Sequence, residues 1–253
     1  MKKLFCFIVL CMVVCFPVFS ATTVDLTTSG SSGSIGTGNF YQYSADISGT
    51  GVIDPFLQIL GSSSTTVQGY NLDSGIEFDE VDSSTHALLL GSIPTVNIGG
   101  TIYREFILDI TENVGLNNEL LSLDDLRLFV DASSTLTGFN PGSNTFIGGS
   151  PTPVYSFGVD DWVKLDSTLS PGSGYSDMIA LIPGFDAYAD TDYVYMYSMF
   201  GAQDDGSNGL GNTDGFEEWS VGMQGAVIPA PGAILLGAIG IGFVRSMRKR
   251  KML

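Results

Sequence analysis

The chain has 253 residues, of which 27 are acidic and only 10 are basic. Most basic residues lie near the two ends, so the central region has only Arg104, Arg127 and Lys164 against all 27 acidic residues, a net charge of −24. A surface this acidic repels phosphate, which argues against a nucleic-acid partner. All three cysteines lie within residues 1–20, so the central region can form neither disulfides nor a zinc–thiolate site.

Residues 1–20 have the pattern of a secretory signal peptide. Two lysines precede an almost wholly apolar run that ends at Phe19, and Val18 and Ser20 fit the positions before a cleavage site. We therefore expect the mature protein to begin after Ser20. Two alternatives stay open: a lipoprotein signal that is cut before Cys15, and an uncleaved membrane anchor.

The region 21–225 is predicted to form one exported all-β domain. It is rich in Gly, Ser, Thr, Tyr and Phe, which favour strands and turns over helices. Residues 21–40 are expected to be a flexible lead-in or a first edge strand, and residues 120–126 could hold one helical turn. Alternating or apolar runs predict strands at residues 41–47, 56–60, 86–90, 106–110, 126–130, 154–159, 162–165, 193–200 and 219–223. Many short strands separated by turn residues indicate a β-sandwich, with a jelly roll as one form of it.

The strongest of these predicted strands is residues 193–200. Three tyrosines and Met199 share one face, and Val194, Met196 and Phe200 share the other. Because both faces are apolar, this strand should lie centrally between two packed layers.

Residues that could carry catalysis are few. Glu217 and Glu218 precede Trp219, which could stack on a sugar, but adjacent residues of a strand point to opposite faces and cannot act as a pair. His86 is the only histidine, and the chain has no phosphate-binding loop and no dinucleotide-binding motif. We therefore expect no catalytic activity.

Calcium is the most plausible cofactor, although we expect at most a weak site. The loop from Asp204 to Gly215 is rich in Asp, Asn and Gly, and a second group contains Asp186, Asp190 and Asp192. Neither group has EF-hand spacing. The alternative is that these residues simply build turns, with no cofactor at all.

The C-terminal segment 226–253 is predicted to anchor the protein in a membrane. Residues 227–244 carry no charge, and a helix of that length spans about 27 Å, enough for a thin hydrocarbon core. A basic cluster follows that would keep this end in the cytoplasm and stop transfer: Arg245, Arg248, Lys249, Arg250 and Lys251.

The order of features in this segment is more specific than a plain anchor. Pro229, Ala230, Pro231 and Gly232 precede the short glycine-containing apolar helix and the basic cluster. This arrangement resembles the PEP-CTERM sorting domain, whose members usually carry Pro-Glu-Pro where this chain has Pro-Ala-Pro. The resemblance implies recognition by an exosortase, a membrane protease of bacteria that is often linked to exopolysaccharide production. A single-span anchor without processing is the alternative.

The sequence thus predicts an exported, membrane-anchored protein that can be released to the cell surface or matrix after processing. Its exported domain is expected to be non-catalytic, with a molecular role that the sequence leaves open. One alternative is a carbohydrate-binding module associated with exopolysaccharide, which should show a row of exposed aromatic residues on one face. A further alternative is an extracellular glycan hydrolase, which needs a groove with facing carboxylates.

Overall fold

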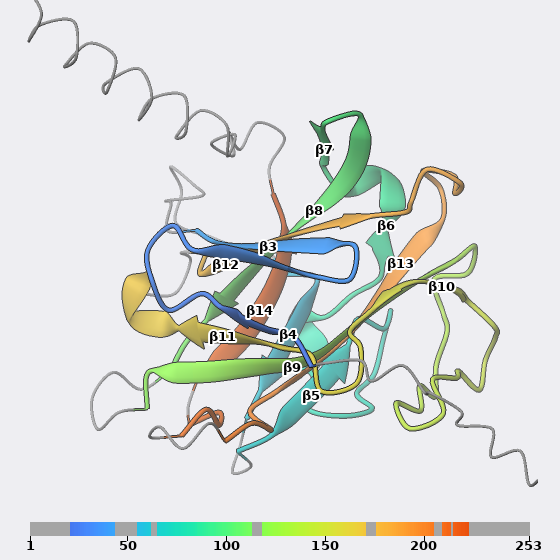
Figure 1. Ribbon diagram of the computed structural model, residues 1–253. Coiled ribbons are helices and arrows are strands. Elements are labelled where there is room, and N and C mark those ends of the chain that lie inside the picture. The colour runs from blue at the N-terminus through green and yellow to red at the C-terminus, as the bar shows by residue number, and fades with distance from the viewer. Residues whose placement is uncertain are drawn as a thin grey trace, which may run out of the picture.

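The computed structural model describes residues 21–43, 55–61, 65–112, 118–170, 176–204, 209–213 and 215–222, which form two β-sheets (Figure 1). The first sheet, sheet A, has the order β1 (Thr23–Asp25), β11 (Trp162–Asp166), β9 (Leu120–Asp131), β13 (Tyr193–Phe200) and β5 (Val67–Tyr70), with β10 (Thr152–Ser156) paired to β9 and β6 (Leu88–Leu89) paired to β13. Sheet B has the order β2 (Ser32–Ile35), β3 (Gly38–Gln42), β12 (Met178–Pro183), β8 (Thr101–Ile110), β14 (Phe216–Val221) and β4 (Leu57–Leu60), with β7 (Thr95–Ile98) paired to β8. The predicted all-β, sandwich-like class is confirmed.

The chain crosses repeatedly between the two sheets. It passes from β4 in sheet B to β5 in sheet A, from β8 to β9, from β12 to β13, and back to β14 in sheet B. As a result, β14 lies between β4 and β8, and β13 lies between β5 and β9. All strand pairs are antiparallel except β1 with β11 among the described residues.

The main core lies between the sheets. From β13 it receives Val194, Met196 and Phe200, which are all fully buried, and from sheet B it receives Phe106 and Trp219. Burial of one large apolar side chain contributes about 1.5–3 kcal/mol, so these side chains stabilise the packing of sheet A on sheet B.

A second apolar layer covers the other face of β13. Tyr195 and Tyr197 pack there with Phe129, Phe139 and Phe146, which come from β9 and from the loop that follows it. The hydroxyl group of Tyr195 donates to the Ser133 carbonyl oxygen at 2.8 Å and accepts from the Leu136 amide at 3.0 Å. The prediction that residues 193–200 form a central strand, apolar on both faces, is therefore confirmed.

The predicted helical turn at residues 120–126 is wrong, because these residues form the first half of β9. Leu121 and Leu123 face the main core, while the backbone N–H of Ser122 between them donates to the Leu210 carbonyl at 3.0 Å. The leucine spacing resembled a helix because the strand contains an irregularity at Asp124–Asp125 that shifts the alternation by one residue.

Other boundaries differ in smaller ways. Residues 21–40 hold β1, β2 and most of β3, so they form edge strands and not a flexible lead-in. Of the predicted strand 41–47, Tyr41 and Gln42 form the end of β3, Tyr43 is not in a strand, and residues 44–47 lie outside the described residues. Of residues 86–90, only Leu88 and Leu89 form a strand.

Both predicted export segments, residues 1–20 and 226–253, lie outside the described residues. Within the part of the chain that is described, no helix has the length and apolar character needed to cross a membrane.

Candidate functional site

A cleft of about 430 Å³ opens on the solvent side of sheet A. Its floor is β9, and its walls come from the end of β10 with the turn that follows, from the end of β13, and from the loop after β9. The lining residues are Asp124, Asp125, Arg127, Asn144, Ser156, Phe157, Gly158, Val159, Asp160, Met199 and Gln203.

A β-bulge places two adjacent carboxylates at the floor of this cleft. Met199 of β13 opposes Asp125, but the next residue, Phe200, opposes Leu123, so Asp124 is the extra residue in β9. Because a bulge interrupts the strict alternation of a strand, Asp124 and Asp125 both line the cleft instead of pointing to opposite faces.

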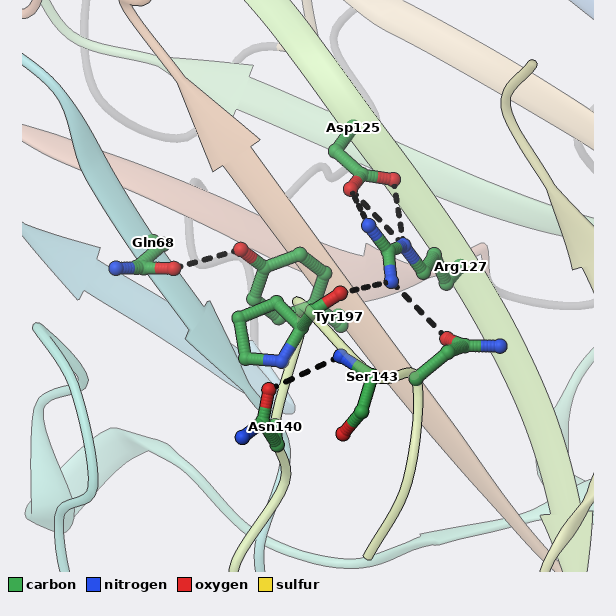
Figure 2. Close-up of polar contacts among 8 residues, drawn as sticks. Gln68, Asp125, Arg127, Asn140, Ser143 and Tyr197 are labelled. Atoms are coloured by element: carbon green, nitrogen blue, oxygen red, sulfur yellow. Dashed lines mark hydrogen bonds and ion pairs between the residues drawn. The ribbon is translucent and has the colours of Figure 1, made fainter. Parts of the chain in front are cut away.

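Arg127 is the positive charge of the cleft, and its guanidinium group is held from several sides (Figure 2). Its Nε donates to both carboxylate oxygens of Asp125, at 3.0 and 2.9 Å, and its Nη2 also pairs with Asp125. Its Nη1 donates to the Pro141 carbonyl at 2.7 Å and to Asn144 Oδ1 at 3.1 Å. This paired geometry ties the loop after β9 to the floor of the cleft.

The guanidinium group of Arg127 also packs against an aromatic ring. The guanidinium carbon of Arg127 lies 5.6 Å from the centre of the Tyr197 ring, a cation–π distance. Tyr197 in turn donates its hydroxyl proton to Gln68 Oε1 at 2.6 Å, as Figure 2 shows. The turn that carries Asn144 is closed by a hydrogen bond from the Ser143 amide to Asn140 Oδ1 at 3.1 Å.

Asp124 differs electrostatically from its neighbour. Its Oδ2 accepts from the Ala202 amide at 2.6 Å. Burial raises the pKa of Asp124 to about 6, and the nearby charge of Asp125 adds to this, whereas hydrogen bonds from Ala202, Ser122 and Gln203 act in the opposite direction. The cleft therefore combines a carboxyl group that titrates in mildly acidic solution with one that is paired to Arg127.

The turn between β10 and β11 forms one wall. Asp160 has a φ of 63°, in the left-handed region, and the Gly158 amide donates to Asp161 Oδ2 at 2.9 Å. Val159 of the same turn is 88% exposed.

The predicted glycan-hydrolase residues are separated as the sequence indicated. Glu217 is fully buried on the core side of β14, while Glu218 on the other face accepts a hydrogen bond from Gln58. Trp219 is fully buried and donates its indole N–H to Ser198 Oγ at 3.1 Å, so it is not a stacking surface. Over the described residues every Tyr and Trp is at least partly buried, and the half-buried Tyr41, Tyr43 and Tyr103 belong to one cluster with Ile107 and Ile179 of sheet B.

Of the predicted calcium ligands, residues 205–208 and 214 lie outside the described residues, and two of the second group make other contacts. Asp190 pairs with Arg104 at 3.1 Å, and Asp192 Oδ2 accepts from the Ala189 amide at 2.9 Å in a turn, whereas Asp186 is exposed. Across the described part of the chain, no group of three or more acidic, histidine or cysteine side chains is suited to a metal ion. His86 is exposed, and its Nδ1 lies 3.0 Å from the carbonyl of the next residue.

The end of the loop from Asp204 to Gly215 instead docks on two buried glutamates. Asn212 Nδ2 donates to Glu217 Oε1 at 2.6 Å and to Glu112 Oε1 at 3.5 Å, and the amide and hydroxyl of Thr213 donate to Glu112 Oε2 at 2.9 and 2.6 Å. We call Glu112, Asn212, Thr213 and Glu217 the carboxyl knot. Burial, and then the charge of Glu112, raise the pKa of Glu217 well above its ordinary value.

A second pair of buried carboxyl groups lies in sheet B. Asp177 Oδ2 accepts from the Ile110 amide at 2.8 Å. The pKa of Asp177 is raised to about 9, chiefly by burial and then by the charge of Asp109 and a hydrogen bond with it, while the hydrogen bond from Ile110 acts in the opposite direction. Neither this pair nor the carboxyl knot was identified from sequence, because the partners lie far apart along the chain and only the sheet register brings them together.

The cleft was also missed. Its signals in the sequence are the Asp124-Asp125 doublet inside an apolar strand, Arg127 two residues later, and the turn residues Asn140 to Asn144. The predicted sorting motif at residues 229–232 and the basic cluster at residues 245–251 lie outside the described residues.

Comparisons of the chain with known protein families, with curated protein sequences and with solved structures give no match.

Proposed function

We propose that this chain is an exported bacterial surface or extracellular-matrix protein, non-catalytic, that is delivered to its site by an exosortase. The proposal rests on the two ends of the sequence: the apolar segment 1–20, and the segment 226–253 with Pro229, Ala230 and Pro231 before an apolar helix and a basic terminus. In this proposal the tail is a membrane span and a sorting signal, and exosortase acts at or near the proline motif.

The positions of the strands along the chain support a folded domain with an export segment on each side. All described strands lie between Thr23 and Val221, which leaves both export segments outside the sheets' sequence range. The last strand, β14, is an interior strand of sheet B, and only a few residues separate Val221 from Pro229. A tail joined so closely to an interior strand would hold the folded domain within about 30 Å of the sorting motif, because an extended chain spans at most about 3.3–3.6 Å per residue.

We further infer that the sandwich is a jelly roll. The chain crosses between the sheets at β4–β5, β8–β9, β12–β13 and β13–β14, and the later strands insert between the earlier ones. This nested antiparallel winding is the arrangement of two Greek keys in a double sheet. The architecture alone assigns no function, since one fold carries many.

The sorting proposal is tested by cell fractionation of variants in an exosortase-containing host. Replacing both Pro229 and Pro231 with alanine should leave an unprocessed protein in the inner membrane, and deleting residues 245–251 should release the domain or let it pass the sorting step. The matched control is the second Pro-x-Pro sequence of the chain, Pro151-Thr152-Pro153. Replacing those two prolines should leave sorting unchanged. Normal surface delivery of the Pro229/Pro231 double variant would contradict the proposal.

A further inference from the structure

We propose that the cleft on sheet A is a binding site for a neutral saccharide, with Arg127, Ser156, Asp160 and Gln203 as its polar contacts. The inference deepens the proposed function, since a domain displayed outside the cell meets saccharides there. It depends on the folded domain alone, so it can fail or hold independently of sorting.

The charges of the cleft disfavour an anionic ligand and a metal ion. Asp124, Asp125 and Asp160 line it together with a single cation, Arg127, on a domain with a large negative net charge. An anionic ligand such as a polyphosphate would be repelled by these carboxylates. A metal ion is disfavoured because Arg127 already neutralises Asp125, with both carboxylate oxygens engaged.

The hydrogen-bonding groups match a ligand that both donates and accepts. The guanidinium group has five N–H bonds. Its Nε, both Nη1 protons and one Nη2 proton are used within the described residues, which leaves one Nη2 proton for a ligand oxygen. The Ser156 hydroxyl and the Gln203 amide add groups that can donate and accept, and Asp160 adds an acceptor. Sugar hydroxyls need this mixture, because each is donor and acceptor at once.

The cleft also has an apolar side. Phe157, Val159 and Met199 belong to its lining, and Val159 is exposed on the turn beside Asp160. The C–H faces of a sugar ring are apolar and can cover such side chains while the hydroxyl groups remain hydrogen-bonded. A volume of about 430 Å³ falls within the range of small-ligand pockets, enough for one or two sugar rings.

The polar floor is preorganised. Arg127 is held by Asp125, by the Pro141 carbonyl, by Asn144 and by the face of Tyr197, as Figure 2 shows. Ordering a long side chain at an interface costs about 0.5–1.5 kcal/mol, and this cost is already met in the free protein. A rigid guanidinium–carboxylate pair at the base of an open cleft is therefore ready to receive a polar ligand.

The test uses the exported domain, residues 21–225, in the wild-type form and in variants whose folding is checked by thermal unfolding. The probes are three immobilised glycans of different charge: dextran as the neutral glycan, alginate as the anionic one and chitosan oligosaccharide as the cationic one. A panel of neutral hexaoses of glucose, galactose and mannose then samples sugar identity. We expect retention by at least one neutral probe and none by alginate.

Two variants disturb the cleft without removing its central network. Ser156→Trp fills it from an exposed position of β10, and Gln203→Ala removes one amide. We expect Ser156→Trp to abolish binding and Gln203→Ala to weaken it about tenfold, the effect of losing one hydrogen bond of about 1.4 kcal/mol. Thr152→Trp is the matched control, since it adds the same ring at an exposed position of the same strand outside the cleft, and it should bind like the wild type.

Three results would overturn the inference: no retention by any neutral probe, stronger retention by alginate or chitosan than by every neutral probe, or equal binding by the Ser156→Trp and Thr152→Trp variants. None of these bears on sorting. Conversely, shortening of a bound hexaose during incubation would contradict the non-catalytic proposal and leave the binding site intact.

Discussion

The cleft on sheet A and the carboxyl knot use the same residue types under opposite conditions. At the cleft, Asp125 is partly exposed and is paired with Arg127 through both of its oxygens. In the knot, Glu217 is fully buried, and its hydrogen bond comes from the amide of Asn212. Burial therefore favours the neutral form of Glu217, whereas Asp125 has a guanidinium group as its partner.

The difference shows how so acidic a domain distributes its charge. A carboxylate near the surface can be neutralised by one of the few basic residues, but a carboxyl group in the core must retain a proton. Proton retention links the stability of the knot and of the Asp109–Asp177 pair to pH. The stability of the cleft, in contrast, should depend on the ion pair that Arg127 forms with Asp125.

The largest expected effect is on the pH dependence of stability. The pKa values of Asp177, Glu105 and Asp124 are raised to about 9, 7 and 6, chiefly by burial. The folded protein then binds more protons than the unfolded chain between about pH 4 and pH 9, so stability falls as pH rises through this window. Asp177 alone should make the free energy of unfolding about 4 kcal/mol lower at pH 8 than at pH 5, and Glu105 and Asp124 should add to this loss, as measured by urea denaturation of the exported domain. A profile that rises toward pH 8 would show that these carboxyl groups are ionised in the fold.

The second prediction concerns the cleft. Arg127→Met should lower the free energy of unfolding by about 3 kcal/mol, because it leaves Asp125, whose side chain is 14% exposed, without its counter-charge. Arg104→Met is the matched control. Its partner Asp190 is 77% exposed, so water screens that pair and we expect a loss of only about 1 kcal/mol. Equal losses of unfolding free energy in the two variants would contradict the expectation that the less exposed Arg127–Asp125 pair contributes more to stability than the Arg104–Asp190 pair.

The third prediction concerns the knot. Glu217→Gln keeps an acceptor for Asn212 and cannot ionise, so it should stabilise the domain by about 2 kcal/mol at pH 8 and have little effect at pH 4. Glu119→Gln, at a partly exposed position with no such environment, should change neither value. If Glu217→Gln destabilises the fold at pH 8, Glu217 is ionised there and its environment favours the charge.

The smallest effect is expected at the turn that walls the cleft. Asp160→Val should destabilise by about 1 kcal/mol, because a β-branched residue fits poorly at a φ of 63°. Asp160→Asn should be neutral, since Asn tolerates this region. Asp186→Val, at an exposed position without positive φ, should also be close to neutral in the same thermal unfolding measurement.

The parts of the fold that could be predicted from sequence are those that alternation alone determines. The faces of β13 followed from residues 193–200, and the separation of Glu217 from Glu218 followed from strand geometry. Neither inference required knowledge of the partner strands.

What could not be predicted depends on register. The extra residue at Asp124 is visible only against β13, and without it residues 120–126 imitate a helical spacing. The knot requires Glu112, which follows β8, and Glu217 of β14 to lie at the same end of sheet B, which the pairing of Glu217 with Ile110 establishes. Since no local pattern encodes a pairing between distant strands, these sites emerge only once the chain is folded.

The measurement that tests the account most directly is the intact mass of the mature protein from its host, with and without the exosortase. The account predicts a protein that begins at Ala21 in both strains, and that loses the C-terminal segment at or near Pro229-Ala230-Pro231 only where the exosortase is present. Persistence of residues 227–253 in both strains would identify an ordinary single-span anchor and contradict the sorting proposal.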